Sequence, residues 1–285
     1  MRFEVLGTFS ISSGSGSVPL HGRMRRTLLG VLLVRANTFV PVNVLTEALW
    51  DSKWEPRAVP KLHWHVHKLR QALPEGDRLV FDNGGYRLEV HPGELDVETF
   101  ETLAGQALKA TDPAQRASLI RQALTHWHGA PYEGLDVPLL SDETMRLSEH
   151  RLVLLEELYQ AELDLGRHAS AAVELADLVR RHPLRQRAQY LLMDALWRAG
   201  RTSDALAAYR RARRISVDQL GLEPGPELRL LERRILAGEV AGPVRTVPRR
   251  CFTGPGEPTG CRFAPAWVTC LRASGLVFGY VPSES

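Results

Sequence analysis

One short segment constrains this chain more than any other: residues 59–73, VPKLHWHVHKLRQAL. Its apolar residues Leu62, Val66, Leu69 and Leu73 recur at intervals of four, three and four, which places them on one buried stripe of a helix. The opposite face carries cationic, aromatic and imidazole side chains, and the segment contains no acid. Because solvated helix faces usually mix both signs of charge, this pattern favours a polyanion opposite the helix. A plain solvated amphipathic helix is the alternative.

The residues that follow this helix predict a hairpin. Residues 81–89 read FDNGGYRLE, in which Asn83-Gly84-Gly85 is a turn signal between two strand-like runs. A helix followed by a hairpin is the order of a winged helix. The segments LRQAL (69–73) and GYRL (85–88) resemble the recognition helix and wing of OmpR/PhoB-type regulators. The resemblance implies an α+β winged helix-turn-helix DNA-binding domain over residues 1–92.

The resemblance also implies which side chains contact DNA. It places Lys61, Trp64 and Lys68 opposite base edges in the major groove, and Arg87 on the wing near the minor groove. Trp64 is bulkier than the residue usual in the family, and Asp82 departs from its usual basic or neutral wing residue, so sequence preference does not carry over. The complete predicted DNA-binding set is Arg25, Arg26, Lys61, Trp64, His65, His67, Lys68, Arg70 and Arg87.

The distribution of charge agrees with a DNA-binding head. Lys and Arg exceed Asp and Glu by four in residues 1–92, whereas residues 93–240 have a net charge of −4. Arg23, Arg25 and Arg26 crowd the start of a predicted helix, where they oppose the macrodipole. An approaching phosphate would relieve this cost, although solvation alone is the alternative.

Residues 93–240 predict an all-α domain with an internal repeat. LGRHASAAVEL (165–175) and AGRTSDALAAY (199–209) align at a period of 34 residues. A helix-turn-helix unit of this length with small residues at the helix crossing is typical of tetratricopeptide repeats, which present surfaces for protein contact. A helical core without a partner is the alternative interpretation.

The second half supports a more specific resemblance. The segments LDVETFETL (95–103), residues 182–213 and LGLEPGPELRLLERRIL (220–236) resemble the bacterial transcriptional activation domain. Joined to an OmpR-type head, they make the chain similar to the Streptomyces antibiotic regulatory protein (SARP) family. This resemblance implies an activator of secondary-metabolite genes that binds direct repeats in double-stranded DNA as a head-to-tail homodimer. It also implies recruitment of RNA polymerase holoenzyme through its sigma factor.

Other classes of function find little support. Residues 241–285 are Gly/Pro/Arg-rich, lack a GxxxxGK phosphate loop and are expected to be largely disordered. The three cysteines lie there without zinc-finger spacing, and His63 and His67 have no third partner, so neither metal nor cofactor is expected. No hydrolase, protease or other catalytic motif occurs, and no membrane span or signal peptide is recognisable, which predicts a cytoplasmic, nucleoid-associated protein rather than an enzyme.

Two alternatives stay open from the sequence. The chain could be a tetratricopeptide scaffold whose winged-helix head serves dimerisation or protein binding. The helical half could also sense a small molecule and gate the head. Steep loss of affinity with added salt would distinguish binding to phosphates from binding to an apolar protein groove.

Overall fold

Alternating apolar residues build a small sheet at the start of the chain. The computed structural model describes residues 1–14, 16–50, 57–135 and 137–240. Strands β1 (Arg2–Glu4), β2 (Ser10–Ser13) and β3 (Gly16–Ser17) pair antiparallel in that order. Phe3 lies opposite Ile11, and both side chains are buried. The alternation of apolar residues ends after Ile11, but the Gly and Ser residues that follow still pair through their backbone, Ser12 with Ser17 and Ser13 with Gly16.

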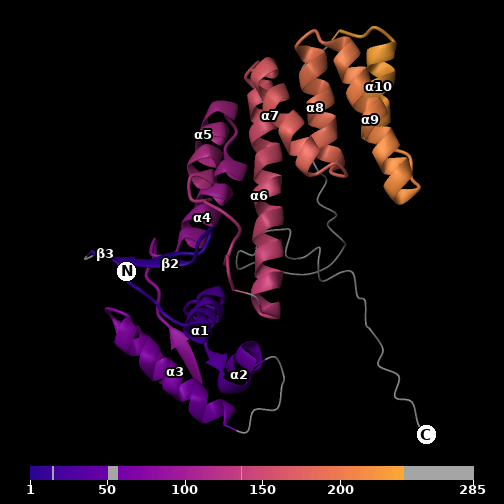
Figure 1. Cartoon of the computed structure of the whole chain (residues 1–285). Helices are drawn as coiled ribbons and strands as arrows, with labels where there is room; N and C mark the ends of the chain where they lie inside the picture. Colours follow the sequence, from indigo (N-terminus) through magenta and orange to yellow (C-terminus); the bar gives the residue numbers. More distant parts are fainter. Residues whose placement is uncertain (15, 51–56, 136, 241–285) are drawn as a thin grey trace, which may run out of the picture. The chain divides into compact units, whose positions relative to one another are not determined.

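Three helices follow this sheet (Figure 1). They are α1 (Arg23–Val34), α2 (Val42–Trp50) and α3 (Ala58–Ala72). Each contacts the other two, and α3 buries the predicted stripe Leu62, Val66 and Leu69, with Leu73 at its end. Helix α1 starts at Arg23, four residues before its buried run begins at Thr27, so Arg23, Arg25 and Arg26 all lie in its first turn.

A second antiparallel sheet carries the predicted hairpin. Its strands are β4 (Val40–Pro41), which precedes α2, and β5 (Leu79–Asp82) and β6 (Gly85–Leu88), which follow the 3-10 turn η1 (Gly76–Arg78). The strand order in the sheet is β4-β6-β5. The turn between β5 and β6 has positive φ at Asn83 and Gly84, 43° and 81°. Two successive residues with positive φ match the right-handed twist of a hairpin. The element order is thus the one predicted for a winged helix.

The rest of the described chain is helical (Figure 1). Consecutive helices pack on one another. They are α4 (Asp96–Lys109), α5 (Pro113–Leu124), α6 (Pro138–Asp164), α7 (His168–Arg181), α8 (Gln186–Arg198), α9 (Thr202–Leu220) and α10 (Pro226–Leu236).

The 34-residue repeat appears as repeated backbone geometry. Gly166 ends α6 with φ of 76°, and Gly200 ends α8 with φ of 77°. At both positions the next residue donates its N–H five residues back, Arg167 to Glu162 O and Arg201 to Leu196 O. This hydrogen bond is typical of a helix C-terminus at which one residue takes the left-handed αL conformation. Glycine adopts that conformation without steric cost. Each repeat therefore turns from one helix to the next in the same way.

Two hydrophobic clusters form the interior. The first extends from Phe3 to Ala161 and includes side chains on both sides of residue 92, and the second lies among α6–α10. At Gly30 of α1, a Cβ atom would lie 2.9 Å from Leu135 Cδ1, so helix α1 closely approaches the helical half. The predicted domain boundaries at residues 92 and 240 stay predictions. The tail from 241 to 285, with Cys251, Cys261 and Cys270, lies outside the described residues.

No helix in the described ranges is long and apolar enough to cross a membrane.

Candidate nucleic-acid interface

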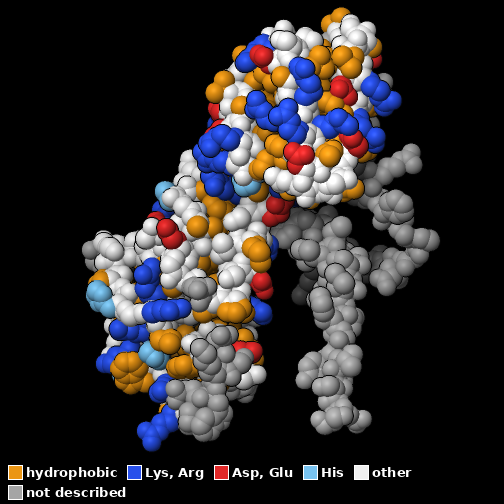
Figure 2. Space-filling view, turned by 45° about the vertical axis from the view of Figure 1, so that its right-hand side comes forward, with side chains coloured by type: hydrophobic (Ala, Val, Ile, Leu, Met, Phe, Trp, Pro, Cys, Tyr) orange, Lys and Arg blue, Asp and Glu red, His pale blue; other side chains and the backbone are white. Residues whose placement is uncertain are grey.

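The solvent face of α3 carries the predicted contact residues. Lys61 and His67 are exposed, Lys68 is half-buried, and the Trp64 indole is 54% exposed. Exposure of so large an aromatic surface is unusual, because burying it would stabilise the fold. Figure 2 shows blue and pale-blue side chains gathered on the lower part of the molecule, where α1–α3 lie. The face is therefore cationic and partly aromatic, as the sequence predicts.

Arg25 of α1 approaches this face from a second helix. Burial lowers the pKa of His65, and the nearby charges of Arg25 and Lys61 lower it further. The His65 ring also lies 4.9 Å from the Trp64 ring and 6.3 Å from the Trp50 ring of α2. Two cationic side chains and an imidazole thus share one site, and positive charge is concentrated there in the absence of a ligand.

The two predicted arginines of α1 diverge. The Arg26 guanidinium lies 5.8 Å from the centre of the Phe9 ring, on the side of the first sheet, whereas Arg25 lies beside His65. Adjacent residues on a helix differ by about 100° in direction, which separates their side chains. Arg25 consequently belongs to the α3 face, and Arg26 does not join it in this structure.

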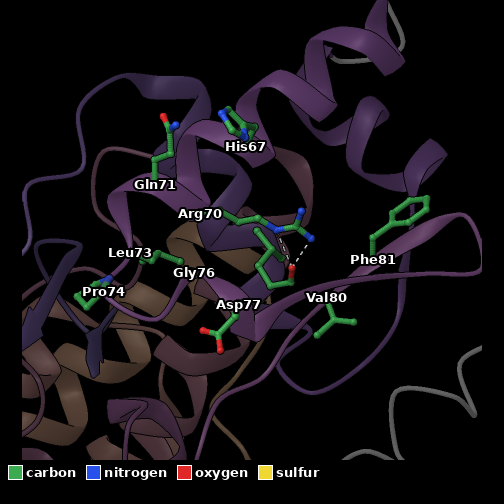
Figure 3. A pocket seen from close by; sticks show the side chains of 10 residues that line it. His67, Arg70, Gln71, Leu73, Pro74, Gly76, Asp77, Val80 and Phe81 are labelled. Carbon is green, nitrogen blue, oxygen red and sulfur yellow. Dashed lines mark hydrogen bonds between the residues drawn. The ribbon is translucent and has the colours of Figure 1, made fainter.

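Arg70 connects α3 to the hairpin. Its Nε and Nη2 atoms donate hydrogen bonds to the Leu79 carbonyl oxygen at 2.9 and 2.5 Å (Figure 3). The Arg70 guanidinium also lies 6.0 Å from the Tyr86 ring centre. A hydrogen bond from a charged donor stabilises more than a neutral one. In this structure Arg70, predicted to contact DNA, holds β5 against α3.

An open groove runs between α3, the turn after it and β5. Its volume is about 670 Å³. In Figure 3, the His67 and Gln71 side chains extend from α3, while Val80 and Phe81 lie on the hairpin side. The residues that line the groove are His67, Arg70, Gln71, Leu73, Pro74, Gly76, Asp77, Leu79, Val80 and Phe81. The groove exposes the flank of α3 beside the hairpin.

The hairpin itself is nearly neutral. Arg87, predicted to reach the minor groove, pairs with Glu89 at 3.1 Å, and both side chains are more than 40% exposed. Such an exposed pair contributes little to stability and separates easily. Tyr86 of the hairpin is buried, and burial raises its pKa. Arg87 would have to leave Glu89 in order to contact a phosphate.

The sequence pattern does not indicate several contacts that hold the hairpin in place. The Asn37 amide donates to Val90 O and accepts from Val90 N, both at 2.8 Å, so it ties the turn after α1 to the end of the hairpin. Asn37 has a positive φ of 60°, which asparagine tolerates. An Asn between two apolar elements was the signal in the sequence. Phe81, which is 51% exposed on the hairpin, is a second residue at this site that the sequence pattern does not indicate.

Other predicted features fall outside or beside this face. Trp50 packs against the hydrophobic core, and Trp54 lies outside the described residues. His63 contacts the Phe81 and Tyr86 rings, each at 6.1 Å between ring centres. Across the described ranges, no three His, Cys, Asp or Glu side chains come together in a group that would hold a metal ion.

Comparison with known proteins identifies the family. Residues 95–236 match the bacterial transcriptional activator domain. The chain is 32% identical over 253 residues to the regulatory protein DnrI of Streptomyces peucetius, covering 84% of this chain and 93% of DnrI. This chain belongs to the SARP family of transcriptional regulators. The SARP relationship extends to the transcriptional regulator RedD of Streptomyces coelicolor, 32% identical over 96% of this chain and 78% of RedD.

Two longer proteins share the same region. The regulatory protein AfsR of Streptomyces griseus is 35% identical over 242 residues, which are 84% of this chain but 25% of AfsR. The chain therefore spans about a quarter of the length of that SARP relative. A solved structure of Mycobacterium tuberculosis EmbR in complex with a low-affinity phosphopeptide superimposes with a TM-score of 0.79 and 28% identity, over 84% of this chain and 65% of EmbR.

Proposed function

We propose that this SARP regulator binds direct repeats in promoter DNA through the α3 face and activates transcription of secondary-metabolite genes in the cytoplasm, at the nucleoid. Residues 1–92 serve as the winged-helix DNA-binding domain, and α3 serves as its recognition helix. Residues 93–240 serve as the activation domain, which recruits RNA polymerase holoenzyme through its sigma factor.

The convergence of Arg25, Lys61 and His65 on one acid-free helix face carries this proposal. A major groove admits one α-helix, and its phosphates accept hydrogen bonds from any cationic donor. In this arrangement Lys61, Trp64 and Lys68 face bases, while Arg25 and His65 face the backbone. The groove on the flank of α3 accommodates the passing sugar-phosphate strand beside His67, and two copies bind head to tail on tandem repeats.

The experiment is a selection of genomic fragments with the purified full chain, followed by titration of the best fragment at two salt concentrations. A tandem direct repeat upstream of a biosynthetic operon, bound with a steep salt slope, supports the proposal. Arg25→Ala should weaken specific and non-specific binding together and reduce the salt slope by about one unit.

Gln115→Ala on α5, remote from α3, is the matched control and should bind like the wild type. No enriched fragment, or a flat salt slope, would contradict the proposal and favour a protein-binding scaffold. Multi-round transcription with the recovered promoter then tests activation separately from binding.

A further inference from the structure

The solvent face of α9 combines arginines with apolar side chains. Arg210, Arg214 and Val217 follow one another at intervals of four and three, so they lie one above another on this helix. Arg211 lies beside them, and all four are exposed, while Ala205, Tyr209 and Ala212 bury the opposite face. Residues 210–217 contain four arginines and no acid.

Three of these arginines make no ion pair in the part of the chain that the structure describes. Arg213 pairs with Glu223, whereas Arg210 donates only to Leu206 O of its own helix, at 3.3 Å. Surface arginines on helices commonly pair with an acid one turn away, as Arg201 does with Asp204. No acid among the described residues therefore neutralises the charges of Arg210, Arg211 and Arg214.

Apolar exposure extends this surface at the C-terminal end of α9. Val217 is 41% exposed, and Leu220 and Leu222 are 50% and 62% exposed. In Figure 2 the end of the molecule formed by α8–α10 shows blue and orange side chains intermixed. Helix-repeat arrays need a polar outer face on their terminal units for solubility, so exposed leucines there indicate a surface that a partner covers.

The charge of this end is opposite to that of the remaining helical half. Residues 93–200 have a net charge of −6, whereas residues 201–240 have a net charge of +2. The tail from 241 to 285 has a net charge of +3, which disfavours it as the occupant of an arginine surface. Nucleic acid would match the arginines but not the neighbouring leucines. An acidic protein helix satisfies both.

We propose that the α9 face of Arg210, Arg211, Arg214 and Val217 binds an acidic amphipathic helix of a protein in the transcription complex, and that this contact carries activation. Acids spaced four residues apart on the partner would match Arg210 and Arg214, which lie about 6 Å apart along the axis. An apolar side chain one turn further along contacts Val217. The inference rests on the proposed activator function and identifies the surface that performs it.

The test separates activation from DNA binding. Arg210→Glu/Arg214→Glu reverses the charge that would match the acids of the partner helix. The control, Arg180→Glu/Arg181→Glu on α7, makes the same charge change at exposed positions elsewhere. DNA affinity is measured by fluorescence anisotropy, and transcription is reconstituted with actinomycete RNA polymerase holoenzyme. We expect the α9 variant to bind DNA within twofold of the wild type and to lose at least tenfold in activated transcript, whereas the α7 variant retains activation.

A conservative variant tests the chemistry of the partner. Arg210→Lys/Arg214→Lys keeps the charge and adds amines that carbodiimide couples to carboxylates. We expect it to retain activation and to yield cross-links from positions 210 and 214 to Asp or Glu side chains of the polymerase. Cross-links only to another copy of this chain, together with dissociation of a wild-type dimer by the α9 glutamate variant in ultracentrifugation, would overturn the assignment.

The remaining outcomes are also decisive. Full activation by the α9 glutamate variant would overturn the inference while leaving the activator function intact. A parallel loss of DNA affinity would assign this face to nucleic acid instead. A wild-type protein that binds its operator but never activates would overturn the proposed activator function, and this inference with it.

Discussion

The carboxylate of Asp96 accepts a hydrogen bond from the backbone N–H of Val5 at 2.8 Å. The same oxygen, Oδ2, accepts from the Leu6 N–H at 2.9 Å, and Oδ1 accepts from the Val97 N–H. Asp96 is 4% exposed, so one buried side chain joins the end of the first strand to the start of α4. Burial raises the pKa of Asp96 despite these three donors. The N-terminal segment that carries the first sheet and the helical half are thereby fastened to each other.

Replacing this carboxylate should destabilise the whole chain. Asp96→Ala leaves three buried N–H groups without their acceptor, and we expect a loss of about 3 kcal/mol in the free energy of unfolding. Asp112→Ala, which removes the exposed N-cap of α5, is the control and should cost about 1 kcal/mol. Urea denaturation followed by circular dichroism measures both values. Equal losses would contradict a special role for Asp96.

Acid should weaken the same junction through Glu94. Although burial opposes ionisation, hydrogen bonds from the Met1 amino group, the His91 N–H and Arg78 lower the pKa of Glu94 to about 2. A carboxyl whose pKa is lower in the folded than in the unfolded chain stabilises the fold above about pH 4.5. This contribution is lost as the pH falls from 4.5 toward 2. Glu94→Gln should therefore flatten the pH dependence of thermal unfolding in that window, and an unchanged profile would refute the assignment.

Two adjacent glycines of the hairpin should respond differently to alanine. At Gly85 a Cβ atom would overlap Val40 O and the Phe39 ring, so Gly85→Ala should separate β4 from β6 and cost about 2–3 kcal/mol. At Gly84 the space is open and only the positive φ opposes a side chain, at a cost of about 1 kcal/mol. Chemical denaturation measures the loss in the free energy of unfolding for both variants. A larger loss for Gly84→Ala than for Gly85→Ala would contradict this prediction.

Lys68 and Arg70 should separate DNA contact from helix positioning. Lys68→Ala removes a half-buried side chain whose ammonium group donates a hydrogen bond to Gln71 of the same helix, so stability should change by less than about 0.5 kcal/mol. Its operator affinity should fall by about 1–3 kcal/mol if it contacts a base. Arg70→Ala releases the Leu79 carbonyl and should cost about 2 kcal/mol of stability. Urea unfolding measures the stability of both variants, and fluorescence anisotropy on the same samples measures their affinity for the operator. Wild-type affinity in Lys68→Ala would contradict a contact between Lys68 and a base.

DNA affinity should depend on the protonation of His65. Burial, Arg25 and Lys61 lower the pKa of His65 in the free protein, so the imidazole is neutral at pH 7. An adjacent phosphate raises this pKa, so DNA binding takes up a proton and affinity falls as pH rises through the interval between the two pKa values. We expect tighter binding at pH 6 than at pH 8 at fixed salt, and a smaller difference in His65→Gln. Equal affinities for the wild type would exclude this coupling.

The sequence by itself determined the elements and the face that they expose. The interval of apolar residues in 59–73 predicted α3 to within one residue, because burial of one stripe is a local consequence of helical periodicity. Asn83-Gly84 predicted the hairpin for a similar reason, since positive φ is a property of single residues. The 34-residue spacing of Gly166 and Gly200 likewise predicted two equivalent helix turns.

Only the tertiary structure decided how those elements meet. Nothing local distinguishes Arg70, which bonds to Leu79 of the hairpin, from Lys68 two residues earlier, which bonds to Gln71 of its own helix. The divergence of Arg25 from Arg26 depends on where α3 and Phe9 lie, and the burial of Asp96 depends on a strand ninety residues away. Such contacts join residues distant in the sequence, so their energies depend on packing geometry, which periodicity and residue type do not encode.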